Sequence, residues 1–395
     1  MKIEVSLKKA KQIIMSMGTE QSILMLASPG VGKSDIVGQI ADALGYECRS
    51  LLGTQIAPED ISGIPRIEGE GNDQRSVFYP PKLLLPADGK PFVLFLNELP
   101  ICNQEVQKAM YSLLLDRRIG ERKLPKGTIV VAAGNNIEDS AMVRAMSTAL
   151  VNRVLMLHIK VDVGEWLEWG KQLGSNGKPK VRDDIRAFIA ANDFCLQYKD
   201  PDTDSKVPSN ANEPFSTPRS WAALSAAMDA LEEFRKDPVK QIKNTYGKKV
   251  DKKVSFLDDA QADGLTELDI AVLAKGTVSV QHADAFCTYK KYNFQDMKPA
   301  EYYIEHPEAV PETSGEDLTN SSKIFERAII FERIQQAFLN PDSSSYKAIE
   351  KLGGARIDAF FSTMPKEFMI ILTEKIVETL QKFGATGTIA RMRLQ

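Results

Sequence analysis

One short stretch constrains the fold of this chain more than any other: an apolar run, a glycine-rich turn and a helical pattern follow one another within residues 22–44. The turn, Ala27–Ser34, reads Ala-Ser-Pro-Gly-Val-Gly-Lys-Ser. In such a strand–turn–helix, backbone N–H groups and the positive end of the helix dipole converge on one point, which suits a phosphate group. The predicted phosphate-binding residues are Ser28, Pro29, Gly30, Val31, Gly32, Lys33 and Ser34.

Two side chains of this turn have the chemistry that a nucleoside triphosphate requires. Lys33 can reach the β- and γ-phosphates, and the Ser34 hydroxyl can ligate Mg²⁺. ATP and Mg²⁺ are therefore the expected ligands. Ala27 stands where the usual pattern has its first glycine, and the loop can accommodate it only if its φ angle is negative.

Composition narrows the class of protein. A chain of 395 residues is too long for one ordinary core, and its net charge of −3 argues against a surface that coats nucleic acid. No apolar run approaches the roughly 18 residues of a membrane span, and the chain does not start like a signal peptide. The four cysteines include no C-x-x-C pair, so neither a zinc site nor a disulfide framework is indicated, and a cytoplasmic location is expected.

Strand and helix patterns alternate along residues 1–160, which is typical of a parallel sheet covered on both faces. The expected strands are Ser22–Leu26, Tyr46–Leu51, Phe92–Leu96, Thr128–Ala133 and Val154–Ile159, and the helices between them are Ser34–Leu44 and Gln104–Leu115. From about residue 161 helical periodicity takes over. Thr217 and Pro218 predict the start of a helix over Arg219–Phe234.

Polar residues end two of the expected strands. The third strand ends at Asn97 and Glu98, and the fourth is followed by Asn135. Because parallel strands bring their carboxyl ends to one edge of the sheet, we expect these residues to lie beside the phosphate-binding loop. Glu98 is then placed to orient and deprotonate the attacking water, and Asn135 to hold the same water from the other side. Asn97 stands where an aspartate usually holds the Mg²⁺ shell, so Mg²⁺ affinity is expected to be weakened.

Taken together, these residues resemble the AAA+ ATPases, and most closely the MoxR-like branch, which often works with von Willebrand A-type partner proteins. The similarity is dense over residues 20–225 and loose after residue 290. Besides the phosphate-binding loop, it rests on Ala57–Pro65, Tyr79–Pro81, Leu94–Leu99, Glu105–Arg118, Val131–Asn135, Ala149–Arg153 and Ser216–Trp221.

The resemblance implies a fold and roles that spacing alone does not show. It implies an α/β AAA+ domain with a parallel five-stranded αβα core over 1–160, an all-helical lid over 161–293 and a helical C-terminal region over 294–395. Asn135 would be the sensor-1 residue, Arg153 the arginine finger acting on a neighbouring subunit, and Arg219 the sensor-2 residue, with Arg144 a less favoured finger. Residues 56–91 would form the helix-2 insert, and 117–124 a short hairpin before sensor 1.

The expected function is ATP hydrolysis by a ring oligomer, most simply a hexamer, that remodels a partner protein with a von Willebrand A-type domain. Two alternatives stay open. In the first, Asn97 makes hydrolysis slow and the chain is a nucleotide-dependent binding module. In the second, the chain is a motor on nucleic acid or a chelatase subunit. The acidic balance disfavours nucleic acid. The basic stretch 235–253 is interpreted as an inserted, solvated loop rather than an anion-binding patch.

Overall fold

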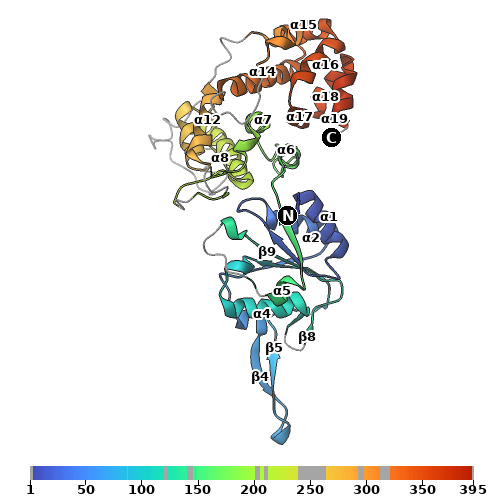
Figure 1. The fold of residues 1–395 in the computed structure, drawn as a ribbon, viewed down its shortest axis with the longest axis vertical. Coiled ribbons are helices and arrows are strands. Elements are labelled where there is room, and N and C mark those ends of the chain that lie inside the picture. Colours follow the sequence, from blue (N-terminus) through green and yellow to red (C-terminus); the bar gives the residue numbers. More distant parts are fainter. Residues whose placement is uncertain are drawn as a thin grey trace. The chain divides into compact units, whose positions relative to one another are not determined.

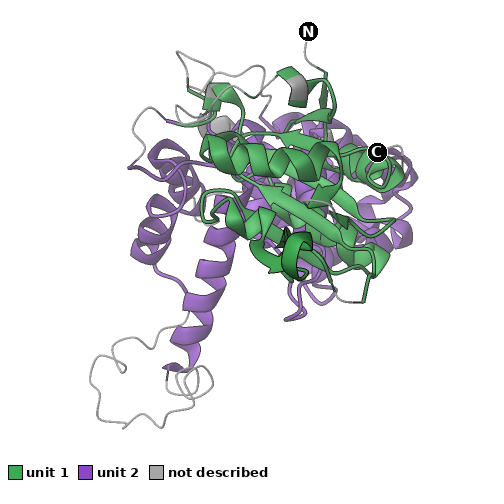
Figure 2. Cartoon of the chain, turned by 90° about the horizontal axis from the view of Figure 1, so that it is seen from below, with its two compact units in different colours: residues 1–162, 199–207 green, residues 163–198, 208–395 purple. Residues whose placement is uncertain are grey.

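The computed structural model describes residues 3–86, 88–119, 122–139, 146, 148–200, 205–208, 212–238, 264–291, 298–311 and 321–393. The chain divides into two compact units, coloured separately in Figure 2. The first consists of Met1–Asp162 with Lys199–Val207, and the second of Val163–Tyr198 with Pro208–Gln395.

A six-stranded parallel sheet forms the centre of the first unit (Figure 1). Its strand order is β1-β10-β2-β9-β6-β3. The strands are β1 (Glu4–Val5), β2 (Ile23–Leu26), β3 (Cys48–Leu52), β6 (Val93–Asn97), β9 (Ile129–Gly134) and β10 (Leu155–Ile159). The five predicted strands are confirmed to within two residues. The predicted number of five strands is wrong, because β1 is a sixth strand at the edge of the sheet. With two residues it is too short to show an alternating pattern.

The central strands are buried on both faces, as their continuous apolar sequences predicted. Their odd-numbered residues, such as Met25 and Phe95, pack in one core with α1 (Leu7–Met17) and α2 (Lys33–Leu44). Even-numbered residues, such as Leu24 and Leu96, pack in a second core with α4 (Gln104–Leu115). The sheet is therefore the middle layer of a three-layer αβα unit.

Two antiparallel hairpins interrupt this pattern at the positions of the two predicted inserts. After α3 (Glu59–Ser62), strands β4 (Ile64–Glu68) and β5 (Arg75–Tyr79) form a ribbon that extends away from the sheet (Figure 1). After α4, β7 (Arg118–Ile119) pairs with β8 (Arg122–Lys123). The short helix α5 (Thr148–Val151) precedes β10.

The second unit is helical, as predicted. Its first helices are α6 (Val163–Lys171), α7 (Asp183–Ala191), α8 (Pro218–Lys236), α11 (Glu267–Lys275), α12 (Val280–Lys291) and α13 (Ala300–Glu305). They are followed by α14 (Ser321–Leu339), α15 (Ser344–Leu352), α16 (Gly354–Thr363), α17 (Lys366–Ile370), α18 (Glu374–Lys382) and α19 (Thr386–Arg393). The boundary near residue 293 stays a prediction, and most of the basic stretch 235–253 lies outside the described residues. Among the described helices, none has the length and apolar character to cross a membrane.

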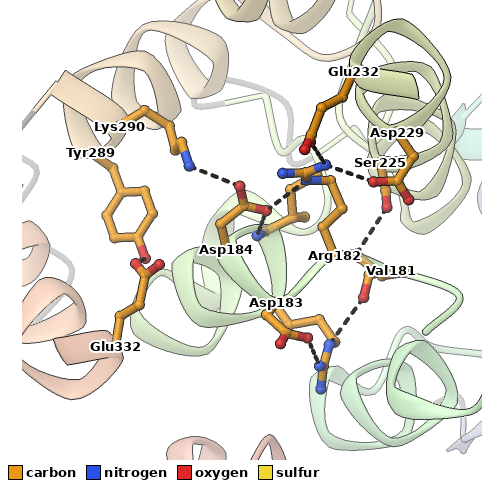
Figure 3. Close-up of polar contacts among 12 residues, drawn as sticks. Val181, Arg182, Asp183, Asp184, Ser225, Asp229, Glu232, Tyr289, Lys290 and Glu332 are labelled. Carbon is orange, nitrogen blue, oxygen red and sulfur yellow. Dashed lines mark hydrogen bonds and ion pairs between the residues drawn. The ribbon is translucent and has the colours of Figure 1, made fainter. Parts of the chain in front are cut away.

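A part-buried polar network around the buried Asp184 links α7, α8, α12 and α14 within this unit (Figure 3). Asp184 accepts from Lys290 at 2.8 Å and from Arg182 at 3.3 Å. Burial alone would raise the pKa of the Asp184 carboxyl, but Lys290 and Arg182 together lower it below its usual value. Nearby, the Tyr289 hydroxyl donates to Glu332 at 2.6 Å. Because the charges of Asp184, Arg182 and Lys290 are already paired, we interpret this network as structural.

Candidate nucleotide-binding site

The glycine-rich turn lies between β2 and α2, and its backbone explains its sequence. Gly30 and Gly32 have φ angles of 71° and 108°, a region that side chains with a Cβ rarely adopt. The described non-glycine residues with positive φ are Glu98 and Arg117, so Ala27 meets the condition set by its position. Ala27 is fully buried, and its N–H donates to Gly134 O at 3.2 Å. It therefore prolongs the pairing of β2 with β9, where a side chain is tolerated.

Lys33 and Asn135 are brought together by the sheet. The Lys33 ammonium donates to Asn135 Oδ1 at 3.0 Å, to Ala27 O at 2.9 Å and to Ser28 O at 3.0 Å. Asn135 follows β9 directly, and β9 is the neighbour of β2. The structure therefore places Lys33 and Asn135 at one edge of the sheet, and their roles stay predictions. The ammonium lies in the concavity of the turn, where a phosphate could replace some of these oxygen partners.

Glu98 follows β6 and adopts a left-handed backbone conformation with φ 61°. Such a conformation costs about 1–3 kcal/mol in a non-glycine residue and is concentrated at functional sites. Its Oε2 accepts from the Thr54 hydroxyl at 2.7 Å. Sequence reasoning missed Thr54. Its position two residues after β3, the strand that pairs with β6, was the signal that could have found it.

Gly134 and Pro100 make a close approach that couples the two polar strand ends. A Cβ at Gly134 would lie 2.3 Å from Cδ and Cγ of Pro100, which is far too close. Pro100 lies two residues after Glu98, and Gly134 directly precedes Asn135. The positions of Glu98 and Asn135 thus depend on a glycine in this place.

A Gly134→Ala variant is expected to lower ATP turnover about 100-fold, because the clash with Pro100 would displace the neighbouring Glu98, and a misplacement of about 1 Å can cost this much in rate. The matched control is Gly38→Ala, since a Cβ at Gly38 meets nothing within 4 Å and alanine favours the helix by about 0.5–1 kcal/mol. Steady-state ATPase assays and thermal melting on both variants test this. Equal turnover in the two variants would contradict the coupling.

The remaining predicted residues occupy separate places. Ser34 lies exposed in the first turn of α2, and Asn97 ends β6 with its carbonyl accepting from Gly53 N–H at 3.0 Å. Arg153 lies exposed between α5 and β10. Arg219 is the second residue of α8 in the second unit, and its sensor-2 role stays a prediction. The less favoured finger, Arg144, lies outside the described residues.

The residues present fit a triphosphate with Mg²⁺. The Ser34 hydroxyl and the Asn97 side-chain oxygen are hard oxygen donors of the kind that Mg²⁺ prefers. In the described part of the chain, no group of three or more histidine, cysteine or acidic side chains could hold a metal by itself. A Mg²⁺ ion here would therefore depend on the phosphates and on water for most of its ligands.

The parallel αβα sheet and the glycine-rich turn between β2 and α2 have the form of a P-loop domain. Residues 22–154 match the family model of the AAA domain, dynein-related subfamily, so this chain carries a domain of the AAA+ class. The resemblance to AAA+ proteins is thereby confirmed. A curated relative, midasin of Giardia intestinalis, is 25% identical over 182 residues, which make up 42% of this chain and 4% of that protein. The chain thus spans only a small part of the length of this relative.

Two solved structures also share similarity with the chain. One, from Cytophaga hutchinsonii and provisionally described as an ATPase, is 14% identical, with a TM-score of 0.29 and coverage of 72% of this chain and 77% of its own. The other, the RuvB Holliday junction branch migration motor of Thermotoga maritima, is 13% identical, with a TM-score of 0.33 and coverage of 88% and 93%.

Proposed function

We propose that this protein binds and hydrolyses ATP as a MoxR-like AAA+ ATPase, in a cytoplasmic ring that remodels a partner protein. The observation that carries the proposal is the contact of Lys33 with Asn135, at the same sheet edge where β6 ends before Glu98. A phosphate-binding lysine, a water-holding amide and a carboxylate are the parts that phosphoryl transfer to water requires.

Each residue has a separate task in this proposal. The turn residues and Lys33 would hold the phosphates, and Ser34 with Asn97 would hold the Mg²⁺ ion, which neutralises charge on the β- and γ-phosphates when bound. Glu98 would accept a proton from the attacking water, and Asn135 would orient that water. The Thr54 hydroxyl, which donates to Glu98, would keep the carboxylate in a defined rotamer before the attacking water binds.

Assembly would complete the site. Arg153 is exposed and has no ion-pair partner among the described residues, as expected of a guanidinium that serves a neighbouring subunit. The hairpin β4–β5 carries exposed apolar side chains, with Ile67 74% and Phe78 50% exposed. A two-stranded ribbon is marginally stable by itself, so these side chains support a role of the hairpin in contacting a neighbouring subunit or a client protein. A partner with a von Willebrand A-type domain is part of the same proposal.

The trans role of Arg153 predicts a specific complementation. Arg153→Ala is expected to lower turnover about 10³-fold or more, the range found for arginine fingers. A mixture of Arg153→Ala with Glu98→Gln subunits should regain activity, because one interface type then combines an intact finger with an intact carboxylate. Turnover of the mixture, and of the wild type during dilution, measures this. No recovery in mixed assemblies, or wild-type turnover that is constant down to the monomer, would contradict the trans role.

Asn97 supports a second candidate, a nucleotide-dependent binding module with little hydrolysis, because an amide supplies no charge to the Mg²⁺ shell. In that case Asn97→Asp should raise turnover strongly, whereas Glu98→Gln should change little. The two candidates thus differ in the response of the same two residues.

A further inference from the structure

A buried hydroxyl–imidazole cluster lies at the start of α8. Ser216 has no exposed surface, and its Oγ lies 2.7 Å from His282 Nδ1 and 2.9 Å from Ser279 Oγ. The Ser279 N–H also donates to Ser216 Oγ at 3.2 Å. Ser216 directly precedes Thr217, the N-cap of α8, and Ser279 directly precedes α12. The cluster therefore joins the starts of two helices.

The hydrogen bonds of this cluster form one consistent set. Burial lowers the pKa of His282 to about 4, so the ring is neutral near pH 7, and a neutral imidazole has one acceptor nitrogen. If Nδ1 is that acceptor, the Ser216 hydroxyl donates to it. The two lone pairs of Ser216 then accept from the N–H and the O–H of Ser279. Every polar atom of the Ser216 hydroxyl is used, so loss of the imidazole would leave a buried donor without a partner.

The backbone of residues 216–218 makes further hydrogen bonds to other parts of the second unit. Ser216 O accepts from Tyr198 N–H at 2.7 Å, and Pro218 O accepts from Trp166 Nε1 at 3.3 Å. Thr217 and Ser220 form a reciprocal capping box. Residues 216–218 are buried, and Arg219 is the first exposed residue of the helix. The backbone from which the Arg219 side chain departs is therefore set by buried contacts, of which His282 provides one from a different helix.

We propose that His282, acting through Ser216, is a positioning residue for Arg219. The inference rests on the proposed function and on the sensor-2 role that the resemblance implies for Arg219, in which its guanidinium would act on the γ-phosphate. A guanidinium on a long side chain stabilises transition-state charge only if its backbone is fixed, and an error of about 1 Å can cost roughly 100-fold in rate. A nucleophilic role for Ser216 is excluded by its complete burial.

Two substitutions in the full-length protein separate positioning from packing. His282→Leu keeps the apolar volume and removes the acceptor, whereas His282→Asn retains an acceptor oxygen near the position of Nδ1. We expect kcat for ATP to fall about 10- to 100-fold in His282→Leu and to recover to within about threefold of wild type in His282→Asn. His306→Leu is the matched control, because His306 is half-exposed and its imidazole contacts the exposed carboxylate of Glu308.

A double-mutant cycle with Arg219→Ala gives the decisive readout. If His282 acts only through Arg219, then adding His282→Leu to Arg219→Ala lowers kcat no further. Ser216→Ala removes the same hydrogen bond from the other side and should reproduce the effect if His282→Leu fails to fold, which thermal melting reveals.

The outcomes are distinguishable. Wild-type protein without ATPase activity, or Arg219→Ala with wild-type kcat, overturns the proposed role of Arg219 and this inference with it. The inference alone is overturned if the wild type is active and Arg219→Ala is defective, but folded His282→Leu or Ser216→Ala has an unchanged kcat. Additive losses in the double mutant, or no rescue by asparagine, also overturn it, since they assign His282 a structural role.

Discussion

Replacement of Glu98 by glutamine is expected to stop ATP hydrolysis while leaving ATP binding intact. The amide preserves the size of the side chain and can still accept a hydrogen bond from Thr54, but it cannot accept a proton from water. Loss of a general base lowers turnover by about 10²- to 10⁴-fold. Single-turnover ATPase assays together with equilibrium binding of a fluorescent ATP analogue measure the two properties separately.

The control for this variant is Glu105→Gln, which removes an exposed carboxylate from the first turn of α4. It should retain wild-type turnover. Turnover of Glu98→Gln within threefold of wild type would be the result that removes Glu98 from the chemistry. It would favour the binding-module interpretation based on Asn97. A fully inactive variant that still binds ATP would, in addition, trap partner proteins in their ATP-bound complex.

The second large effect is expected for Lys33→Met, which should lose ATP binding itself. The ammonium would make charge-assisted hydrogen bonds to the phosphates, each contributing about 1.5–3 kcal/mol. Its removal should weaken ATP binding by roughly 10- to 150-fold per lost bond. The variant also leaves Ala27 O, Ser28 O and Asn135 Oδ1 without the donor that they share. Isothermal titration with ATP and Mg²⁺ measures the loss.

Lys108→Met provides the matched control, because Lys108 is exposed on α4. Thermal melting distinguishes lost binding from lost folding: ATP should raise the melting temperature of the wild type and of Lys108→Met, but not of Lys33→Met. Unchanged ATP affinity in folded Lys33→Met would show that the turn at residues 28–34 is not the phosphate-binding site. Together with Glu98→Gln, this separates binding from chemistry.

Most strands of the central sheet and the helices α2 and α4 were predicted because caps and apolar runs are signals between neighbouring residues. The helix Gln104–Leu115 has the predicted bounds, with Asn103 as its cap. Three of the strands combine continuous apolar sequence with a length that admits few other structures. The edge strand β1 was not predicted, since two residues carry no period, and its pairing with β10 joins segments more than 150 residues apart.

The sequence by itself determined the turn at 27–34, the succession of strands and helices along the chain, and the polar residues at the strand ends. Each of these depends only on neighbours along the chain. Only the tertiary structure decided that Thr54 donates to Glu98, that Pro100 requires a glycine at position 134, and that Lys33 contacts Asn135. These contacts depend on strand order and register, which arise from the packing of distant segments, and no local pattern encodes such distances.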